Sequence, residues 1–271
     1  MATAIETAWS VATVTRAAPT RGTLGAAVAL AGLTVLLEVP YPLVSGRVRD
    51  RLTIAAVLTF CAASTAHAVA TRGARWAATL VAVAAGAGLL AESVGTHTGI
   101  PFGAYSYDGG LGPRLLDVPL VIPLAWAMMA YPALLIGRGI ASSGLGRAIA
   151  GGVALASWDL FLDPQMVRAG HWRWSDTTPH LPGVPSVPLT NYLGWLVVAV
   201  LLMAVLNSVL NSVLSDVPAA VPADDRVPLG LYLWTFGSSV LANLTFFGRP
   251  NVALWGGLVM GAVLVALWRS R

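Results

Sequence analysis

Residues 148–163 read AIAGGVALASWDLFLD, an apolar stretch that ends with two aspartates, Asp159 and Asp163, four residues apart. Small and aliphatic residues of this kind let helices pack closely inside a lipid bilayer. Residues four apart lie on one face of an α-helix, so both carboxyl groups are predicted to point the same way. An ionisable group at membrane depth is costly, and it faces a partner, a cavity or a substrate rather than lipid. The stretch therefore predicts a transmembrane helix that carries a functional pair of acids.

The whole chain has the composition of a membrane protein. Of its 271 residues, 56% are hydrophobic and 10% are charged, whereas a soluble domain has about 25% charged residues. Apolar segments long enough to cross a bilayer lie at about 22–45, 52–70, 76–95, 116–137, 145–163, 192–214, 228–248 and 252–269. We therefore predict an all-α fold, a polytopic transmembrane helical bundle of about 7–8 helices.

The domain organisation follows from these segments. Residues 1–21 form a small, polar N-terminal tail without an evident cleavable signal, and Arg16 and Arg21 precede the first apolar run. Residues 22–271 form a single integral-membrane domain, interrupted by a polar linker near 215–227. The expected location is the cell membrane, as a multi-pass protein.

Charge and cysteine content exclude several classes of function. The net charge is +4, but the basic residues are arginines scattered over loops and tails, which predicts membrane-edge charges and no nucleic-acid partner. The sequence contains no lysine, which excludes Schiff-base chemistry. Cys61 is the single cysteine, so no intramolecular disulfide can form. No spacing of histidine, cysteine and carboxylate residues predicts a metal site.

Two further acids, Glu38 and Glu92, also lie inside apolar segments. Glu92 precedes the first of two long connections, at about 96–115 and 164–191. Because two predicted helices separate these connections, both lie on the same side of the membrane whichever way the chain inserts. They are rich in aromatic and polar residues between turn-forming glycines and prolines. Such loops suggest a lid or a binding site, although an aromatic belt at the headgroup level is an alternative.

The pair Asp159 and Asp163 has more than one interpretation. It could be half of a Mg²⁺–diphosphate site, as in membrane prenyltransferases, for which the only comparable acidic patch is Asp224–Asp225 in the predicted linker. It could instead hold a general acid kept protonated by apolar surroundings and by its neighbour. A structural alternative is that Asp163, before Pro164, ends a helix or pairs with an arginine such as Arg168.

Two segments carry a resemblance to a known family. They are ESVGTHTGIPFGAYSYDGGLGPRLLDVPLVIPLAW (residues 92–126) and, between residues 157 and 195, SWDLFLDPQM, HWRW, GVP and NYLGW in order. Their spacing resembles the integral-membrane carotenoid biosynthesis family that includes carotenoid 1,2-hydratases of the bisanhydrobacterioruberin hydratase and γ-carotene 1′-hydratase type. The resemblance covers about residues 85–200, the motif core. His180-Leu181-Pro182 precedes Gly183 where the family often has an aromatic pair, and this departure leaves the substrate end group open.

The resemblance implies a hydratase that needs no cofactor and adds water to the terminal C1–C2 double bond of an acyclic carotenoid ψ-end. Protonation of that bond gives a tertiary carbocation, which needs a strong acid, a dry pocket and aromatic faces. Asp159 is the expected proton donor, tuned by Asp163 or Glu92. The expected substrate-binding residues are the aromatic wall and the residues that orient water: Phe102, Tyr105, Tyr107, Trp158, Trp172, Trp174, His97 and Asn191.

The same residues leave other functions open. A carotenoid cyclase or isomerase would use the same carbocation and close a ring instead of capturing water. A non-catalytic carotenoid-binding protein would leave the buried acids without a purpose. The expected partners are a lipophilic carotenoid, water, the lipid bilayer and other enzymes of the carotenoid pathway. Arg114 and Asp117 are expected to form a structural ion pair, and Glu38, outside the motif core, is a secondary candidate.

Overall fold

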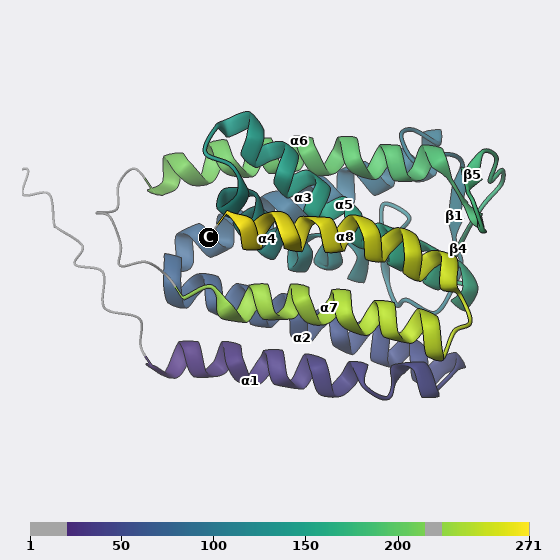
Figure 1. Cartoon of the computed structure of the whole chain (residues 1–271), viewed down its shortest axis with the longest axis horizontal. Helices are drawn as coiled ribbons and strands as arrows, with labels where there is room; N and C mark the ends of the chain where they lie inside the picture. The colour runs from purple at the N-terminus through teal and green to yellow at the C-terminus, as the bar shows by residue number, and fades with distance from the viewer. Residues whose placement is uncertain (1–20, 215–223, 271) are drawn as a thin grey trace, which may run out of the picture.

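A computed structural model describes residues 21–214 and 224–270 of the chain. Residues 1–20 of the predicted tail and residues 215–223 of the predicted linker lie outside this description. Within it, eight helices are long and apolar enough to cross a membrane. They are α1 (Arg21–Glu38), α2 (Gly46–Arg72), α3 (Ala74–Thr98), α4 (Val121–Ile140), α5 (Gly144–Ala169), α6 (Leu189–Leu214), α7 (Arg226–Thr245) and α8 (Pro250–Arg269). Figure 1 shows them as one elongated bundle, which confirms the predicted fold class.

Several helices differ from the predicted segments. Helix α2 begins at Gly46 rather than near residue 52, and α4 begins at Val121 rather than near residue 116. Helix α1 ends at Glu38, and a short 3-10 turn, η1 (Tyr41–Leu43), follows it because Pro40 and Pro42 cannot extend an α-helix. Helix α5 continues through Pro164 and ends at Ala169, where Gly170 takes the left-handed conformation. Asp163 therefore lies inside a helix, and the suggestion that it ends one is wrong.

Helix α4 forms the centre of the bundle. Its side chains are buried on every side from Val121 to Gly137, apart from a few at its first turn. Helices α2, α3, α5, α6, α7 and α8 all contact it. A helix that is hydrophobic all round is stable only when other apolar elements surround it, and the apolar sequence of α4 meets this requirement.

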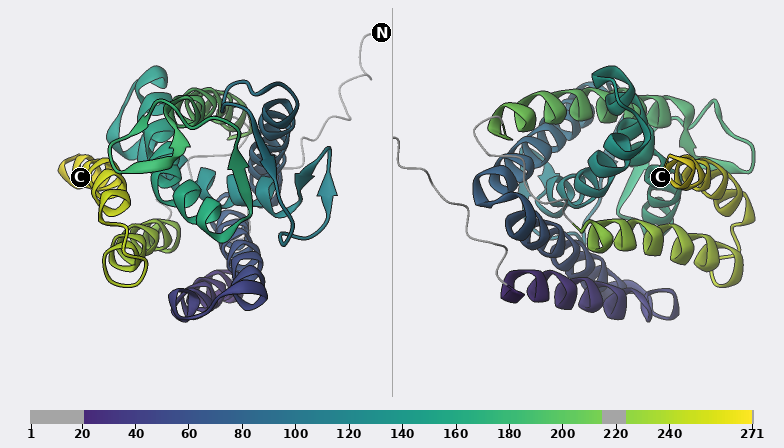
Figure 2. Two further views of the ribbon diagram at one scale, coloured as in Figure 1. Left: turned by 90° about the vertical axis from the view of Figure 1, so that its right-hand side faces the viewer. Right: turned by 60° about the vertical axis from the view of Figure 1, so that its left-hand side comes forward.

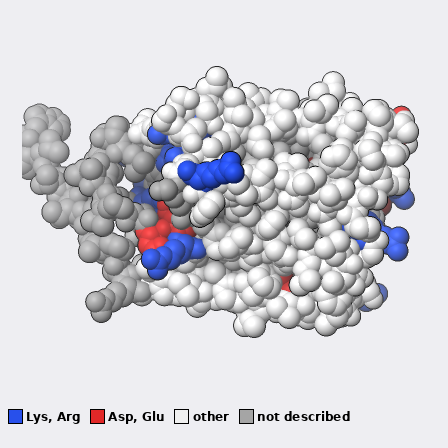
Figure 3. Space-filling view, viewed as in Figure 1, with Lys and Arg blue, Asp and Glu red and all other residues white. Residues whose placement is uncertain are grey.

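Charged side chains are confined mainly to the two ends of the bundle. Figure 3 shows arginine and acidic residues near both ends and a broad, nearly uncharged belt between them. Many large apolar side chains of the belt are exposed, among them Leu36, Leu90, Leu201, Leu241 and Leu258. An exposed apolar belt between charged ends is the surface that a lipid bilayer covers. The chain is a multi-pass membrane protein.

The two long connections meet at one end of the bundle, as predicted. They contain six short strands: β1 (Tyr105–Tyr107), β2 (Arg114–Leu115), β3 (Val118–Pro119), β4 (Trp172–Trp174), β5 (His180–Leu181) and β6 (Val184–Pro188). Strand β1 of the first connection pairs with β4 of the second, while β2 pairs with β3 and β5 pairs with β6, all antiparallel. Figure 2 (left) looks onto this end, with the strands in front of the helices.

Candidate active site

The β1–β4 ladder turns four aromatic side chains into the protein. Tyr105 lies opposite Trp174, and Tyr107 lies opposite Trp172. These four residues are buried, whereas Ser106 and its partner Arg173 are exposed. Successive side chains of a strand point to opposite faces, so the alternation in Tyr-x-Tyr and Trp-x-Trp places all four rings on the inner face. The tyrosine and tryptophan rings pack edge to face or tilted, with centroids 5.5–5.7 Å apart.

Glu92 of α3 lies beneath this ladder and accepts three hydrogen bonds. Its Oε2 accepts the hydroxyl protons of Tyr105 at 2.5 Å and Tyr107 at 2.7 Å. Its Oε1 accepts the indole N–H of Trp126 of α4 at 3.0 Å. Burial, reinforced by the neighbouring Glu92, raises the pKa of Tyr105 and Tyr107 well above the ordinary value. Both tyrosines therefore remain protonated and act as donors.

Two glycines make room for the groups that reach Glu92. A Cβ atom on Gly88, one turn before Glu92, would lie 2.6 Å from Cγ of Trp126. A Cβ atom on Gly95, one turn after it, would lie 2.8 Å from the Phe102 ring and 3.0 Å from the Tyr105 hydroxyl. Residues three and four apart share a helix face. The three-residue spacing of Glu92 and Gly95 in the segment ESVG therefore has a steric reason.

Asp159 and Asp163 meet around one amide group. The Nδ2 of Asn191, at the start of α6, donates to Oδ2 of Asp159 at 2.9 Å and to Oδ2 of Asp163. All three side chains are buried, and neither aspartate forms an ion pair with a described residue. The suggested pairing of Asp163 with Arg168 is therefore wrong. Oδ1 of Asp159 is buried and has no hydrogen-bond partner among the residues that the structure describes.

A small cavity of about 50 Å³ lies between the two acidic groups and the aromatic ladder. Nine of the predicted site residues line it: Glu92, Phe102, Tyr105, Tyr107, Trp158, Asp163, Trp172, Trp174 and Asn191. Asp159 does not line it and lies behind Asp163 in contact with the shared amide. A polar cavity needs about 10–15 Å³ to hold a water molecule, so this cavity has room for water.

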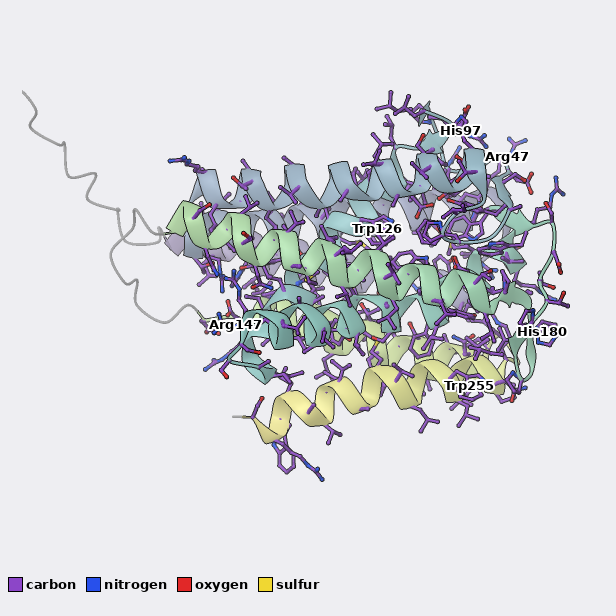
Figure 4. The ribbon with its side chains drawn as sticks, turned by 90° about the horizontal axis from the view of Figure 1, so that it is seen from above. Arg47, His97, Trp126, Arg147, His180 and Trp255 are labelled. Atoms are coloured by element: carbon purple, nitrogen blue, oxygen red, sulfur yellow. The ribbon has the colours of Figure 1, made fainter. Side chains whose placement is uncertain are left out.

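His97 is not part of this cavity. Its side chain is 56% exposed, and Nε2 lies 3.3 Å from the Asp117 carboxylate. Figure 4 shows His97 at the edge of the bundle, whereas Trp126 lies inside it. The expected ion pair between Arg114 and Asp117 is not formed. Arg114 instead donates to the backbone carbonyls of Tyr107 and Asp108, at 2.9 and 2.7 Å, and so holds the end of β1.

Trp126 and Trp195 are site residues that the sequence analysis did not assign. Their rings stack with centroids 4.1 Å apart and planes 7° apart, and Trp158 meets Trp195 edge to face. Both stacked tryptophans line the small cavity. Each of these tryptophans is the last residue of one of the two segments that resemble the family, so the sequence did mark them. Local spacing, however, does not show that the two segments meet.

The remaining acidic candidates lie away from the small cavity. Glu38 accepts the indole N–H of Trp234 of α7 at 2.6 Å, in a second cavity described below. Asp225, just before α7, pairs with Arg72, the last residue of α2, at 2.7 Å. Figure 1 shows the end of α2 and the start of α7 at the end of the bundle opposite the strands. The second acidic patch that a metal–diphosphate site would need is therefore not near Asp159 and Asp163. No cluster of three or more potential metal ligands occurs within 21–214 and 224–270.

These features define a class of protein: a multi-pass membrane protein with a buried acidic and aromatic site beneath loops at one end of its bundle. The family described as "Carotenoid biosynthesis protein" matches residues 52–266, and the chain belongs to this family. The resemblance seen in the two segments is thereby confirmed.

A comparison with curated proteins identifies a relative of the hydratase type. The chain is 38% identical over 120 residues to the bisanhydrobacterioruberin hydratase of Haloarcula japonica. The match covers 41% of this chain and 39% of the length of that relative. No solved structure matches the chain significantly.

Proposed function

We propose that the protein is a carotenoid hydratase that adds water to the terminal C1–C2 double bond of an acyclic carotenoid ψ-end without a cofactor. The observation that carries this proposal is the small cavity, where buried carboxyl groups face a wall of aromatic rings and leave room for water. The family supports a role in carotenoid biosynthesis, and the name of the similar relative supports hydration as the kind of reaction. The substrate partners are a lipophilic carotenoid and water, and the cell membrane supplies the carotenoid.

The reaction balances with the groups of the cavity alone. A carboxylic acid donates its proton to C2 of the double bond, which leaves the positive charge on C1, a tertiary carbon. The oxygen of a water molecule then forms a bond with C1. The carboxylate takes up the proton that this water releases, so the acid is regenerated and the product has gained one molecule of water.

Asp163 is the proton donor that the geometry favours. Its side chain lines the cavity, whereas Asp159 lies behind it and touches the same Asn191 amide. Two buried carboxyl groups without a cationic partner do not both carry a charge, because like charges at close range repel. The pair therefore holds a proton. We assign its delivery to the double bond to Asp163, with Asp159 as the neighbour that shares the proton and Asn191 as the amide that orients both carboxyl groups.

The aromatic wall stabilises the cation. Trp126, Trp158 and Trp195 form one contiguous group on one side of the cavity, and the β1–β4 ladder supplies the other side. A cation over an aromatic face gains about 0.5–2 kcal/mol per ring, more when water is excluded. Glu92, which lines the cavity between these groups, adds electron-rich oxygens.

The test is conversion of lycopene in a host that produces it. The purified product of the expressed chain should have gained water by mass spectrometry. Asp163→Asn should lower conversion by about 10²–10⁴-fold, the usual contribution of a general acid. Asp159→Asn should reduce conversion less, because the new amide can still contact the Asn191 side chain. Asp117→Asn is the control. It makes the same change from carboxylate to amide on a side chain that is 74% exposed, and conversion should be unchanged.

Other outcomes contradict the proposal. A product of unchanged mass with a closed ring would identify a cyclase instead of a hydratase. Full activity of Asp163→Asn together with loss of activity in Asp159→Asn would transfer the donor role to Asp159. Unchanged pigment from a well-expressed protein would argue against the reaction at a lycopene end.

A further inference from the structure

A second and much larger cavity adjoins the small one. It has a volume of about 780 Å³ and lies between α1, η1, α2, α5 and α7. Small-molecule sites have volumes of about 300–1,000 Å³ and are lined mostly by apolar and aromatic groups. The lining here includes Phe60, Phe246 and Phe247, and Glu38, bonded to Trp234, is its only charged residue among those the structure describes.

The large cavity opens toward the lipid-facing surface. Residues that line it are themselves more than half exposed: Val39 and Leu43 after α1, Leu233 and Leu241 on α7, and Phe246 just after α7. Helices α1 and α7 lie side by side in both Figure 1 and Figure 2. The mouth of the cavity is therefore between these two helices, in the apolar belt of the protein.

Only one layer of side chains separates the two cavities. Thr53 and Val57 of α2 and Trp158, Leu162 and Met166 of α5 line both of them. Leu162 and Met166 lie on either side of Asp163 in the sequence, so the layer of side chains between the two cavities lies beside this acid. Methionine is unbranched and adapts its shape to irregular spaces. The Met166 side chain can therefore move aside when a ligand enters.

The small cavity alone cannot hold the substrate of the proposed reaction. At about 50 Å³ it accommodates water, whereas a carotenoid is a rigid, apolar chain that must extend well beyond its reacting end. We propose that the large cavity is a lateral portal that takes the polyene chain from the bilayer. This inference rests on the proposed function. The terminal double bond then crosses this layer of side chains at Leu162 and Met166 to reach Asp163.

The chemistry of the cavity favours a polyene over a phospholipid. No arginine or lysine lines it in the described part of the chain. The nearby guanidinium groups of Arg49 and Arg249 are stacked over the Tyr41 and Phe247 rings at its edge. The Glu38 carboxyl group accepts the Trp234 indole N–H and offers a phosphate no positive charge. A polyene carries no charge, so it needs no cationic partner and suits the mainly apolar lining.

Two glycines of α7 provide a matched test. Gly237 lines the large cavity, and Gly230, seven residues earlier, does not. Both are exposed, and within the described part of the chain neither has a neighbouring atom within 4 Å of the Cβ position. Gly237→Trp therefore places an indole at the cavity, and Gly230→Trp places the same bulk on the same helix outside it. Gly237→Ala adds little volume and reports on the backbone change alone.

The measurement is the amount of lycopene that copurifies with each variant from a lycopene-producing host, per mole of protein, in the Asp163→Asn background that prevents turnover. Gly237→Trp should retain less than about one-tenth of the pigment, because a ligand pocket buries most of its ligand. Gly230→Trp should retain all of it, and Gly237→Ala should retain more than Gly237→Trp; none of the three should unfold at a lower temperature than the parent. Conversion by the same substitutions in the active protein should follow the same order.

The outcomes separate this inference from the proposed function. Equal pigment in Gly237→Trp and Gly230→Trp would overturn the portal, even if the active protein hydrates lycopene. Loss of pigment in Gly237→Trp alone, without any hydration by the active protein, would keep the portal and overturn the hydratase. Copurified phospholipid that Gly237→Trp displaces, with no change in pigment, would overturn the polyene as the occupant.

Discussion

Tyr105 and Trp174 lie directly opposite each other in the β1–β4 ladder, although 68 positions separate them in the chain. Their rings are 5.7 Å apart, and the Trp174 indole N–H donates to the carbonyl of Phe102 at 2.9 Å. This pairing joins the connection after α3 to the connection after α5. It also aligns Tyr107 with Trp172, so one register places four aromatic rings over three carboxyl groups.

The register of the ladder can be tested by cross-linking. Ser106 and Arg173 are paired and exposed, and the Cα atoms of paired residues in antiparallel strands are about 4.5–5.5 Å apart. Ser106→Cys with Arg173→Cys, in a Cys61→Ala background, should react rapidly with a short bifunctional thiol reagent. Mass spectrometry of the digested protein should find the two connections linked.

The control for the cross-link uses the opposite end of the bundle. Ser106→Cys with Ser142→Cys places the second thiol at the exposed start of α5. This pair should give no intramolecular product under the same conditions. Equal yields from both double variants would show that β1 and β4 do not pair.

Gly88 is expected to be intolerant of any side chain. Gly88→Ala would force its Cβ against Trp126, whose ring is 2.6 Å away, and overpacking costs about 1–3 kcal/mol. Gly86→Ala is the matched control on α3, because no atom of the described residues lies within 4 Å of its Cβ position. It should raise stability by up to about 1 kcal/mol, the helix propensity gain of alanine over glycine. Thermal unfolding in detergent measures both, and similar effects would contradict the close approach of α3 and α4.

Trp126→Phe should weaken the site through Glu92. The substitution keeps an aromatic ring but removes the N–H that Oε1 of Glu92 accepts at 3.0 Å. A buried acceptor left without its donor costs about 1–3 kcal/mol. Trp255→Phe also removes an indole donor, but that donor serves the carbonyl of Pro182 at the exposed surface, and it should change stability by less than about 0.5 kcal/mol. Chemical denaturation compares the two, and a silent Trp126→Phe would show that Glu92 does not depend on this bond.

Asn191→Leu should impair the reaction without unfolding the protein. Leucine has a similar size but cannot donate to Asp159 and Asp163, so the two carboxyl groups lose the amide that orients them. We expect conversion of lycopene to fall by more than about tenfold, within the range of general-acid effects. Asn211→Leu is the control on the same helix, since Asn211 is exposed and bonds only Arg138 among described partners. Equal conversion by both variants would remove Asn191 from the site.

Much of the fold was accessible from the sequence because membranes impose strong constraints. Apolar runs of sufficient length must be helices, since a bilayer offers no partners to backbone groups. Because two membrane-spanning helices separate the two long connections, both connections had to lie on the same side of the membrane. The four-residue spacing predicted that Asp159 and Asp163 share a helix face, and Asn191 bonds both of them.

The tertiary structure decided which of these residues act together. Local periodicity does not fix the rotation of α5 against α6 within the bundle, and this rotation turns Asp163 toward the cavity and leaves Asp159 behind it. It does not reveal that His97, near the end of α3, is exposed and contacts Asp117, or that Trp126 and Trp195 stack across α4 and α6. The sequence by itself determined the helices, the shared side and the inventory of acids and rings. Contacts between distant segments determined the site, because its register and packing depend on how whole helices fit together.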